Sequence, residues 1–127
     1  MTREQVAASY GDDTAVSLDL LVGYCDEAAQ LVDRGRESFQ NDFILQRASE
    51  AILNRIGDTV RNRLPQELLD DYPDQPWNQI VSQRIRAAHI YHSLDYRMVW
   101  TTFCEHIPRL RAYVHDEILG DPSQQDR

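Results

Sequence analysis

Three side chains suited to phosphodiester chemistry lie close together in the sequence: Arg84, His89 and Tyr91. A histidine that titrates near neutral pH can remove the proton from a ribose 2′-hydroxyl or protonate a leaving oxygen. A guanidinium can stabilise the charge that builds on the phosphate in the transition state. No carboxylate cluster accompanies these residues in the sequence. The pattern therefore predicts phosphodiester chemistry that uses neither a metal ion nor another cofactor.

The distribution of charge singles out the same region. The chain has a net charge of −8, with 13 basic and 21 acidic residues, which argues against a nonspecific nucleic-acid coat protein. Residues 77–115 nevertheless contain five arginines and only two acidic residues. All 13 basic residues are arginines, the side chain best suited to bidentate contact with phosphate. This part of the chain is therefore locally cationic within an acidic protein.

Helix geometry restricts how these residues can meet. At about 100° per residue, Arg84 and Tyr91 lie within about 20° of each other on a continuous helix, whereas His89 is rotated about 140° from Arg84. Either the helix ends before His89, or the second residue comes from another subunit, as in a symmetric dimer. Arg86 shares a face with His89 and is a candidate supporting residue. His92 is the next candidate if His89 points away.

Several short motifs follow one another in a specific order. Arg84, His89 and Tyr91 form an Arg-x-x-x-x-His-x-Tyr signature. The other motifs are FILQRASEAILNRIG at 43–57, Pro73-Asp74-Gln75-Pro76-Trp77, Asp95 with Val99-Trp100, and Pro108-Arg109-Leu110. In order and spacing, over roughly residues 17–118, they resemble the HepT-like toxins of the HEPN superfamily.

The resemblance implies an all-α, HEPN-type bundle that forms a homodimer and cleaves RNA, such as tRNA, without a metal ion. It implies that Arg84 binds and polarises the phosphate and that His89 is the general acid/base. It further implies a type VII-like toxin–antitoxin system. In such a system an MntA-like nucleotidyltransferase silences the toxin by adding AMP to Tyr91.

Two other functions stay open on the sequence alone. Family members often carry a polar residue, commonly Asn, directly after the motif arginine, and this chain has Ile85 there. That difference favours a non-catalytic subunit that binds nucleic acid or a nucleotide for a nucleotidyltransferase partner. The third alternative is a structural helical dimer whose Arg, His and Tyr residues only decorate its surface.

Helical periodicity predicts the elements that position these residues. We expect a loose leader at 1–14, a helical domain at 15–119 and a frayed tail at 120–127. Four main helices are expected at 15–32, 38–63, 77–88 and from Ser93 or Asp95 to 118, with a short helix at 66–71 and a turn at 72–76. Pro108 is expected to kink or split the last helix. The fold class is therefore an all-α bundle.

Length and composition narrow the remaining possibilities. A chain of 127 residues fits one domain. No apolar run approaches the ~20 residues needed to cross a bilayer, and no apolar core of a secretory signal follows the first residues. Cys25 and Cys104 lie far apart, without a Cys-x-x-Cys pair, so reduced thiols in a cytoplasmic protein are expected.

Overall fold

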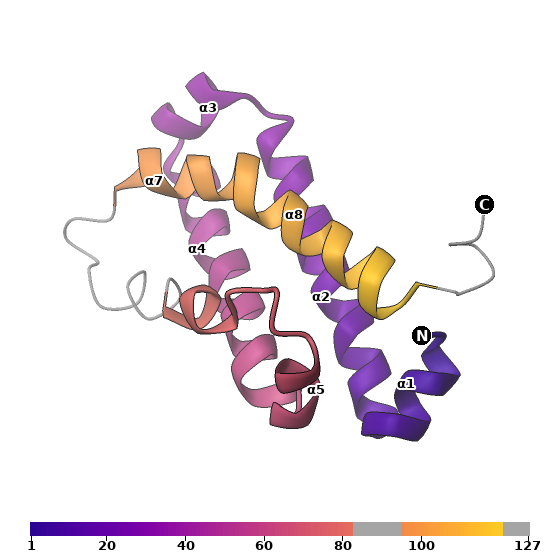
Figure 1. The fold of residues 1–127 in the computed structure, drawn as a ribbon. Coiled ribbons are helices and arrows are strands. Elements are labelled where there is room, and N and C mark those ends of the chain that lie inside the picture. The colour runs from indigo at the N-terminus through magenta and orange to yellow at the C-terminus, as the bar shows by residue number, and fades with distance from the viewer. Residues whose placement is uncertain (83–94, 121–127) are drawn as a thin grey trace.

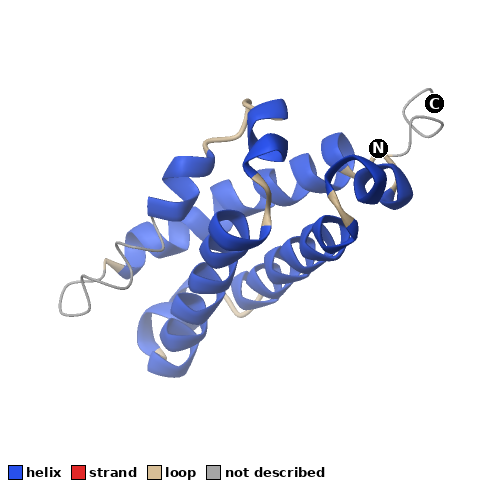
Figure 2. Cartoon of the chain, turned by 90° about the horizontal axis from the view of Figure 1, so that it is seen from below, coloured by secondary structure: helices blue, strands red, loops and turns tan. Residues whose placement is uncertain are grey.

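The computed structural model describes residues 1–82 and 95–120. The elements in this part of the chain are α1 (Arg3–Tyr10), α2 (Asp12–Val32), α3 (Arg36–Asn41), α4 (Phe43–Asp58), η1 (Thr59–Arg63), α5 (Gln66–Asp71), α7 (Tyr96–Thr101), η2 (Thr102–His106), α8 (Ile107–Ala112) and η3 (Tyr113–Ile118). Residues 77–82 are also helical. The described residues contain no strand, which confirms the all-α fold class (Figures 1 and 2).

The N-terminal segment is an ordered helix, so the expectation of a loose leader at 1–14 was wrong. Thr2 accepts a hydrogen bond from the backbone N–H of Gln5, and the Gln5 side chain accepts one from the backbone N–H of Thr2. This reciprocal capping box satisfies two donors that a helix start leaves unpaired. Val6 is completely buried. The helix is therefore held both by its cap and by its packing against α2.

The two ends of the described chain lie side by side (Figure 1). The backbone nitrogen of Met1 donates to the carbonyl oxygens of Ile118 and Gly120, at 2.9 and 2.8 Å. Gly120, expected to begin a frayed tail, is therefore tied to the first residue. The remainder of that tail, 121–127, lies outside the described residues.

Helix α2 is the central element of the bundle. It begins after Gly11, whose φ of 107° favours glycine, and Asp12 and Asp13 occupy its first turn, where the helix dipole favours negative charge. α1, α4 and α8 all pack against it. The predicted boundary at residue 32 is confirmed, while the predicted start at residue 15 is three residues late.

The helix expected at 38–63 consists of three consecutive pieces. α3 ends at Asn41, and the Asp42 side chain then accepts a hydrogen bond from the backbone N–H of Ile44, which starts α4. α4 continues into the π-helical turn η1 before Leu64 and Pro65 end the run as predicted. Ile44, in the first turn of α4, is 64% exposed.

The last helical stretch runs without a gap from residue 96 to residue 118. The π-helical turn η2 immediately precedes α8, where Pro108 lies in the first turn. Proline lacks an N–H and crowds the preceding carbonyl, and a wider turn accommodates both effects. Pro108 therefore does not divide the helix. The apolar residues that recur at helical spacing along this stretch are all buried: Val99, Phe103, Ile107, Leu110, Val114 and Ile118.

Among the described helices, none combines the length and the apolar character that a bilayer-spanning segment needs.

Candidate functional site

The residues predicted to do chemistry, Arg84, Arg86, His89, Tyr91 and His92, lie outside the described residues. Their roles stay predictions. The structure does show how the chain is fixed on both sides of them, at Trp77 before the motif and at Asp95 after it.

The segment that leads into the motif is anchored by Trp77. Its side chain is buried, and its indole N–H donates to the carbonyl oxygen of Tyr72 at 2.8 Å. The indole ring meets the ring of Tyr113 edge-on, with centroids 6.5 Å apart. The predicted turn at 72–76 is confirmed, and Trp77 closes it before the helical residues 77–82 begin. The entry to the motif is therefore fixed to the last helical stretch.

The segment that leaves the motif is fixed by a helix cap. The Asp95 side chain accepts a hydrogen bond from the backbone N–H of Arg97 at 3.0 Å and so begins α7, which confirms the second of the two predicted caps. This backbone N–H holds the pKa of Asp95 below its ordinary value, with help from the Arg97 guanidinium 3.3 Å away. The carboxylate is therefore charged at neutral pH, as a cap at a helix start requires.

Aromatic contacts attach α7 to the rest of the bundle. The ring of Tyr96 meets the completely buried Phe39 edge-on at 5.9 Å, and Trp100 lies against the same ring at 5.3 Å. The Tyr96 hydroxyl donates to Glu50 of α4 at 3.0 Å, and Glu50 also pairs with Arg47. Burial, together with the bond to Glu50, raises the pKa of Tyr96. The exit from the motif is thus joined to both α3 and α4.

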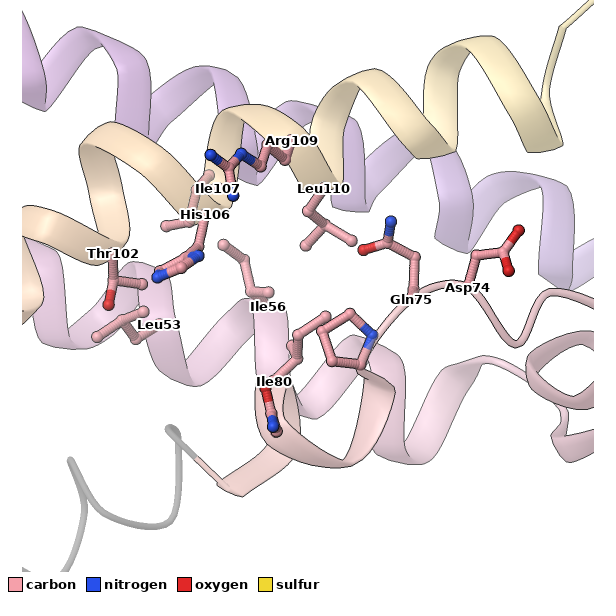
Figure 3. A pocket seen from close by; sticks show the side chains of 12 residues that line it. Leu53, Ile56, Asp74, Gln75, Ile80, Thr102, His106, Ile107, Arg109 and Leu110 are labelled. Atoms are coloured by element: carbon pink, nitrogen blue, oxygen red, sulfur yellow. The ribbon is translucent and has the colours of Figure 1, made fainter.

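A pocket of about 310 Å³ lies between residues 74–80 and the helices α4, η2 and α8 (Figure 3). Its lining includes His106 and Arg109, a second imidazole and guanidinium in the cationic part of the chain. This pair was not among the residues predicted to form the site, although its three-residue spacing on a helix indicates a shared face. Leu53 and Ile56 of α4 lie across the pocket from them.

Among residues 1–82 and 95–120, no group of three or more His, Cys, Asp or Glu side chains is placed to hold a metal ion. Cys25 is buried and Cys104 is exposed, and both are free thiols, as the sequence predicts.

Comparison with known proteins identifies similar sequences. The sequence model of the family described as "Ribonuclease HepT-like" matches residues 21–116. A protein of Caldanaerobacter subterraneus subsp. tengcongensis named "Putative RNase" is 35% identical over 80 residues, which cover 63% of this chain and 70% of that protein. A Methanocaldococcus jannaschii protein, also named "Putative RNase", is 27% identical over 115 residues, covering 91% and 93% of the two chains.

A third relative, from Thermococcus cleftensis, is named "Probable ribonuclease HepT". It is 29% identical over 91 residues, which cover 68% of this chain and 82% of that protein. No solved structure matches the chain.

Proposed function

The chain belongs to the HepT-like ribonuclease family, and we propose that it is a toxin that cleaves RNA without a metal ion, with Arg84 and His89 as its catalytic residues. The observation that carries this proposal is the family match over residues 21–116, which contains the whole Arg84–Tyr91 signature. The cationic composition of residues 77–115 supports it, since RNA is a polyanion.

In this proposal His89 moves a proton and Arg84 stabilises charge. The 2′-oxygen of a ribose attacks the adjacent phosphorus and loses its proton to a base, while the bond from phosphorus to the 5′-oxygen breaks and that oxygen gains a proton. His89 serves as the general acid/base, and Arg84 binds the phosphate whose charge rises in the transition state. The products are a 2′,3′-cyclic phosphate and a 5′-hydroxyl, so no metal-bound nucleophile is involved.

The direct test is cleavage of total tRNA by the purified protein in the presence of EDTA. Arg84→Ala and His89→Ala should each lower the cleavage rate at least 100-fold, because general acid/base catalysis and charge stabilisation each contribute about that much. Arg61→Ala and His115→Ala are matched controls, since both side chains are exposed and lie outside the signature. Unchanged cleavage in either signature variant, with both variants folded, would refute the assignment.

We further propose that the active protein is a homodimer whose site combines Arg84 of one protomer with His89 of its partner. The two variants above then provide a test by mixing. A heterodimer of Arg84→Ala and His89→Ala protomers has one complete site and one doubly defective site. Random exchange should restore about a quarter of the wild-type sites. A site built within one protomer predicts that every mixture stays inactive.

Regulation by a partner forms the last part of the proposal. An MntA-like nucleotidyltransferase in the same cytoplasm would transfer AMP from ATP to the Tyr91 hydroxyl, which loses its proton while pyrophosphate leaves, and this places a negative charge and a bulky nucleotide beside Arg84. Co-expression should add the mass of one AMP to the wild-type protein and none to Tyr91→Phe. Full silencing of Tyr91→Phe would instead favour inhibition by complex formation.

Ile85 supports one rival, a subunit that binds nucleic acid for a nucleotidyltransferase without cutting it. This rival predicts binding of tRNA with no cleavage products. Restoring a polar residue with Ile85→Asn would then be expected to produce cleavage.

A further inference from the structure

We propose that the pocket between residues 74–80 and the η2–α8 helix binds one nucleotide of single-stranded RNA next to the nucleotides that are cut. The inference rests on the proposed ribonuclease function, because it concerns how the same substrate is held. It assigns a role to His106 and Arg109, which lie outside the catalytic signature.

The interior of the pocket is apolar and suits the faces of a nucleobase. Ile56, Ile107 and Leu110 are all less than 5% exposed and form its inner wall. Ile80 lies on the opposite side (Figure 3), and Pro76 also lines the pocket. A volume of about 310 Å³ is at the small end of ligand-binding cavities, which fits a single nucleotide better than a longer segment.

The rim of the pocket carries amides that can read the edge of a base. Gln75 and Gln79 both line it. Each amide has a carbonyl acceptor and two N–H donors, the combination that base edges require. Within the described part of the chain, neither side chain has a hydrogen-bond partner, so both are available to a ligand.

One end of the pocket is suited to a phosphate. His106 and Arg109 are three residues apart on a continuous helix and therefore share a face. Four other arginines are paired with acids: Arg3, Arg47, Arg97 and Arg111. His106 and Arg109, by contrast, have no ion pair or hydrogen bond with any described residue. The carboxylate of Asp74 lies at the opposite end of the pocket in Figure 3, away from His106.

Chain connectivity limits how far this pocket can be from the start of the signature. Gln79 is five residues before Arg84 in the sequence. Even a fully extended chain would separate their Cα atoms by at most about 18 Å. A strand of RNA whose scissile phosphate contacts Arg84 therefore has neighbouring nucleotides within reach of the pocket.

The test measures binding separately from cleavage. The probe is a short, fluorescein-labelled oligoribonucleotide with 2′-O-methyl groups, which cannot be cut because the attacking 2′-hydroxyl is blocked. Fluorescence anisotropy would give its Kd for wild type, His106→Ala and Arg109→Ala. We expect each variant to weaken binding about fivefold to tenfold, and the double variant more, because each loses a contact to phosphate, which for the Arg109 guanidinium is charge-assisted. Arg61→Ala controls for a general loss of positive charge, and His115→Ala controls for the loss of an exposed imidazole.

The outcomes separate this inference from the proposed function. If probe binding depends on the pocket residues but the protein cuts no RNA, the proposed nucleotide site is supported and the proposed ribonuclease activity is refuted. If the double variant cleaves tRNA normally and binds the probe as wild type does, the proposed nucleotide site is refuted and the ribonuclease function is not. Absence of probe binding by wild type, or an equal loss in the Arg61→Ala control, would also overturn it. AMP is the second probe: pocket-dependent binding of AMP without binding of the oligonucleotide would identify a mononucleotide site instead and refute the RNA assignment.

Discussion

Removing the ring of Phe39 should destabilise the protein severely, because this side chain joins α3 to α7, the helix that follows the Arg84–Tyr91 signature in the sequence. Phe39 is completely buried and contacts the rings of both Tyr96 and Trp100. A buried Phe→Ala substitution costs about 3–5 kcal/mol in free energy of unfolding. Since a typical domain has about 5–15 kcal/mol in total, Phe39→Ala should lose a large share of it.

A second substitution at the same site divides this cost into two parts. Phe39→Leu keeps most of the apolar volume but removes the two aromatic contacts, which are worth about 0.5–1.5 kcal/mol each. We therefore expect Phe39→Leu to cost about 1–3 kcal/mol in free energy of unfolding. Phe43→Ala is the matched control: the same residue type is 69% exposed at the start of α4, so its substitution should change stability by less than about 0.5 kcal/mol.

Urea unfolding followed by circular dichroism would measure these differences. The protomer concentration must be the same for every variant, because dimerisation would couple stability to concentration. If the free energies of unfolding of Phe39→Ala and Phe43→Ala differ by less than about 1 kcal/mol, the Phe39 ring does not hold α3 against α7. That result would refute the inference that Phe39 anchors the helix after the signature.

Three further predictions follow from the contacts on either side of the signature and from the two thiols. Asp95→Ala should lower the melting temperature at neutral pH, because α7 loses its cap. The pKa of Asp95 is held below its ordinary value, so the ionised carboxylate stabilises the fold at any pH above that ordinary pKa. The difference in melting temperature between Asp95→Ala and wild type should therefore shrink as the pH falls below about 4. Trp77→Phe should cost about 1–3 kcal/mol in urea unfolding, because the carbonyl of Tyr72 loses its donor; a cost near zero would show that water replaces the indole. In Ellman's assay one thiol, Cys104, should react in the folded protein and two in urea, because Cys25 is buried and burial raises its pKa to about 12; rapid reaction of both in the folded state would contradict that burial.

Local signals in the sequence predicted helix boundaries correctly where a single residue type determines the backbone conformation. Pro65 ends the α4–η1 run, and the short helix at 66–71 begins and ends where it was predicted. Asp95 caps α7 because its side chain accepts a hydrogen bond two residues away. The apolar spacing from Val99 to Ile118 identified a stripe that is entirely buried. These features depend on contacts within a few residues, so the sequence alone carries them.

The predicted helix boundaries were wrong where one local signal was outweighed by another signal or by tertiary packing. The break at Asp42 was missed because apolar residues continue at helical spacing on both sides of it, although the side chain is a good helix cap. The N-terminal segment looked too polar to pack, yet burial of Val6 and the capping box formed by Thr2 and Gln5 hold it in place.

The order of residues alone is enough to show that this protein is helical, to assign it to a ribonuclease family, and to select the arginine, histidine and tyrosine that are candidates for its chemistry. Only the tertiary structure brought His106 and Arg109 to the same pocket as Gln75 and Gln79. The physical reason is that helical periodicity reports which face of a helix is apolar but not which distant segment covers that face. A pocket between segments about thirty residues apart therefore appears only once the helices have packed.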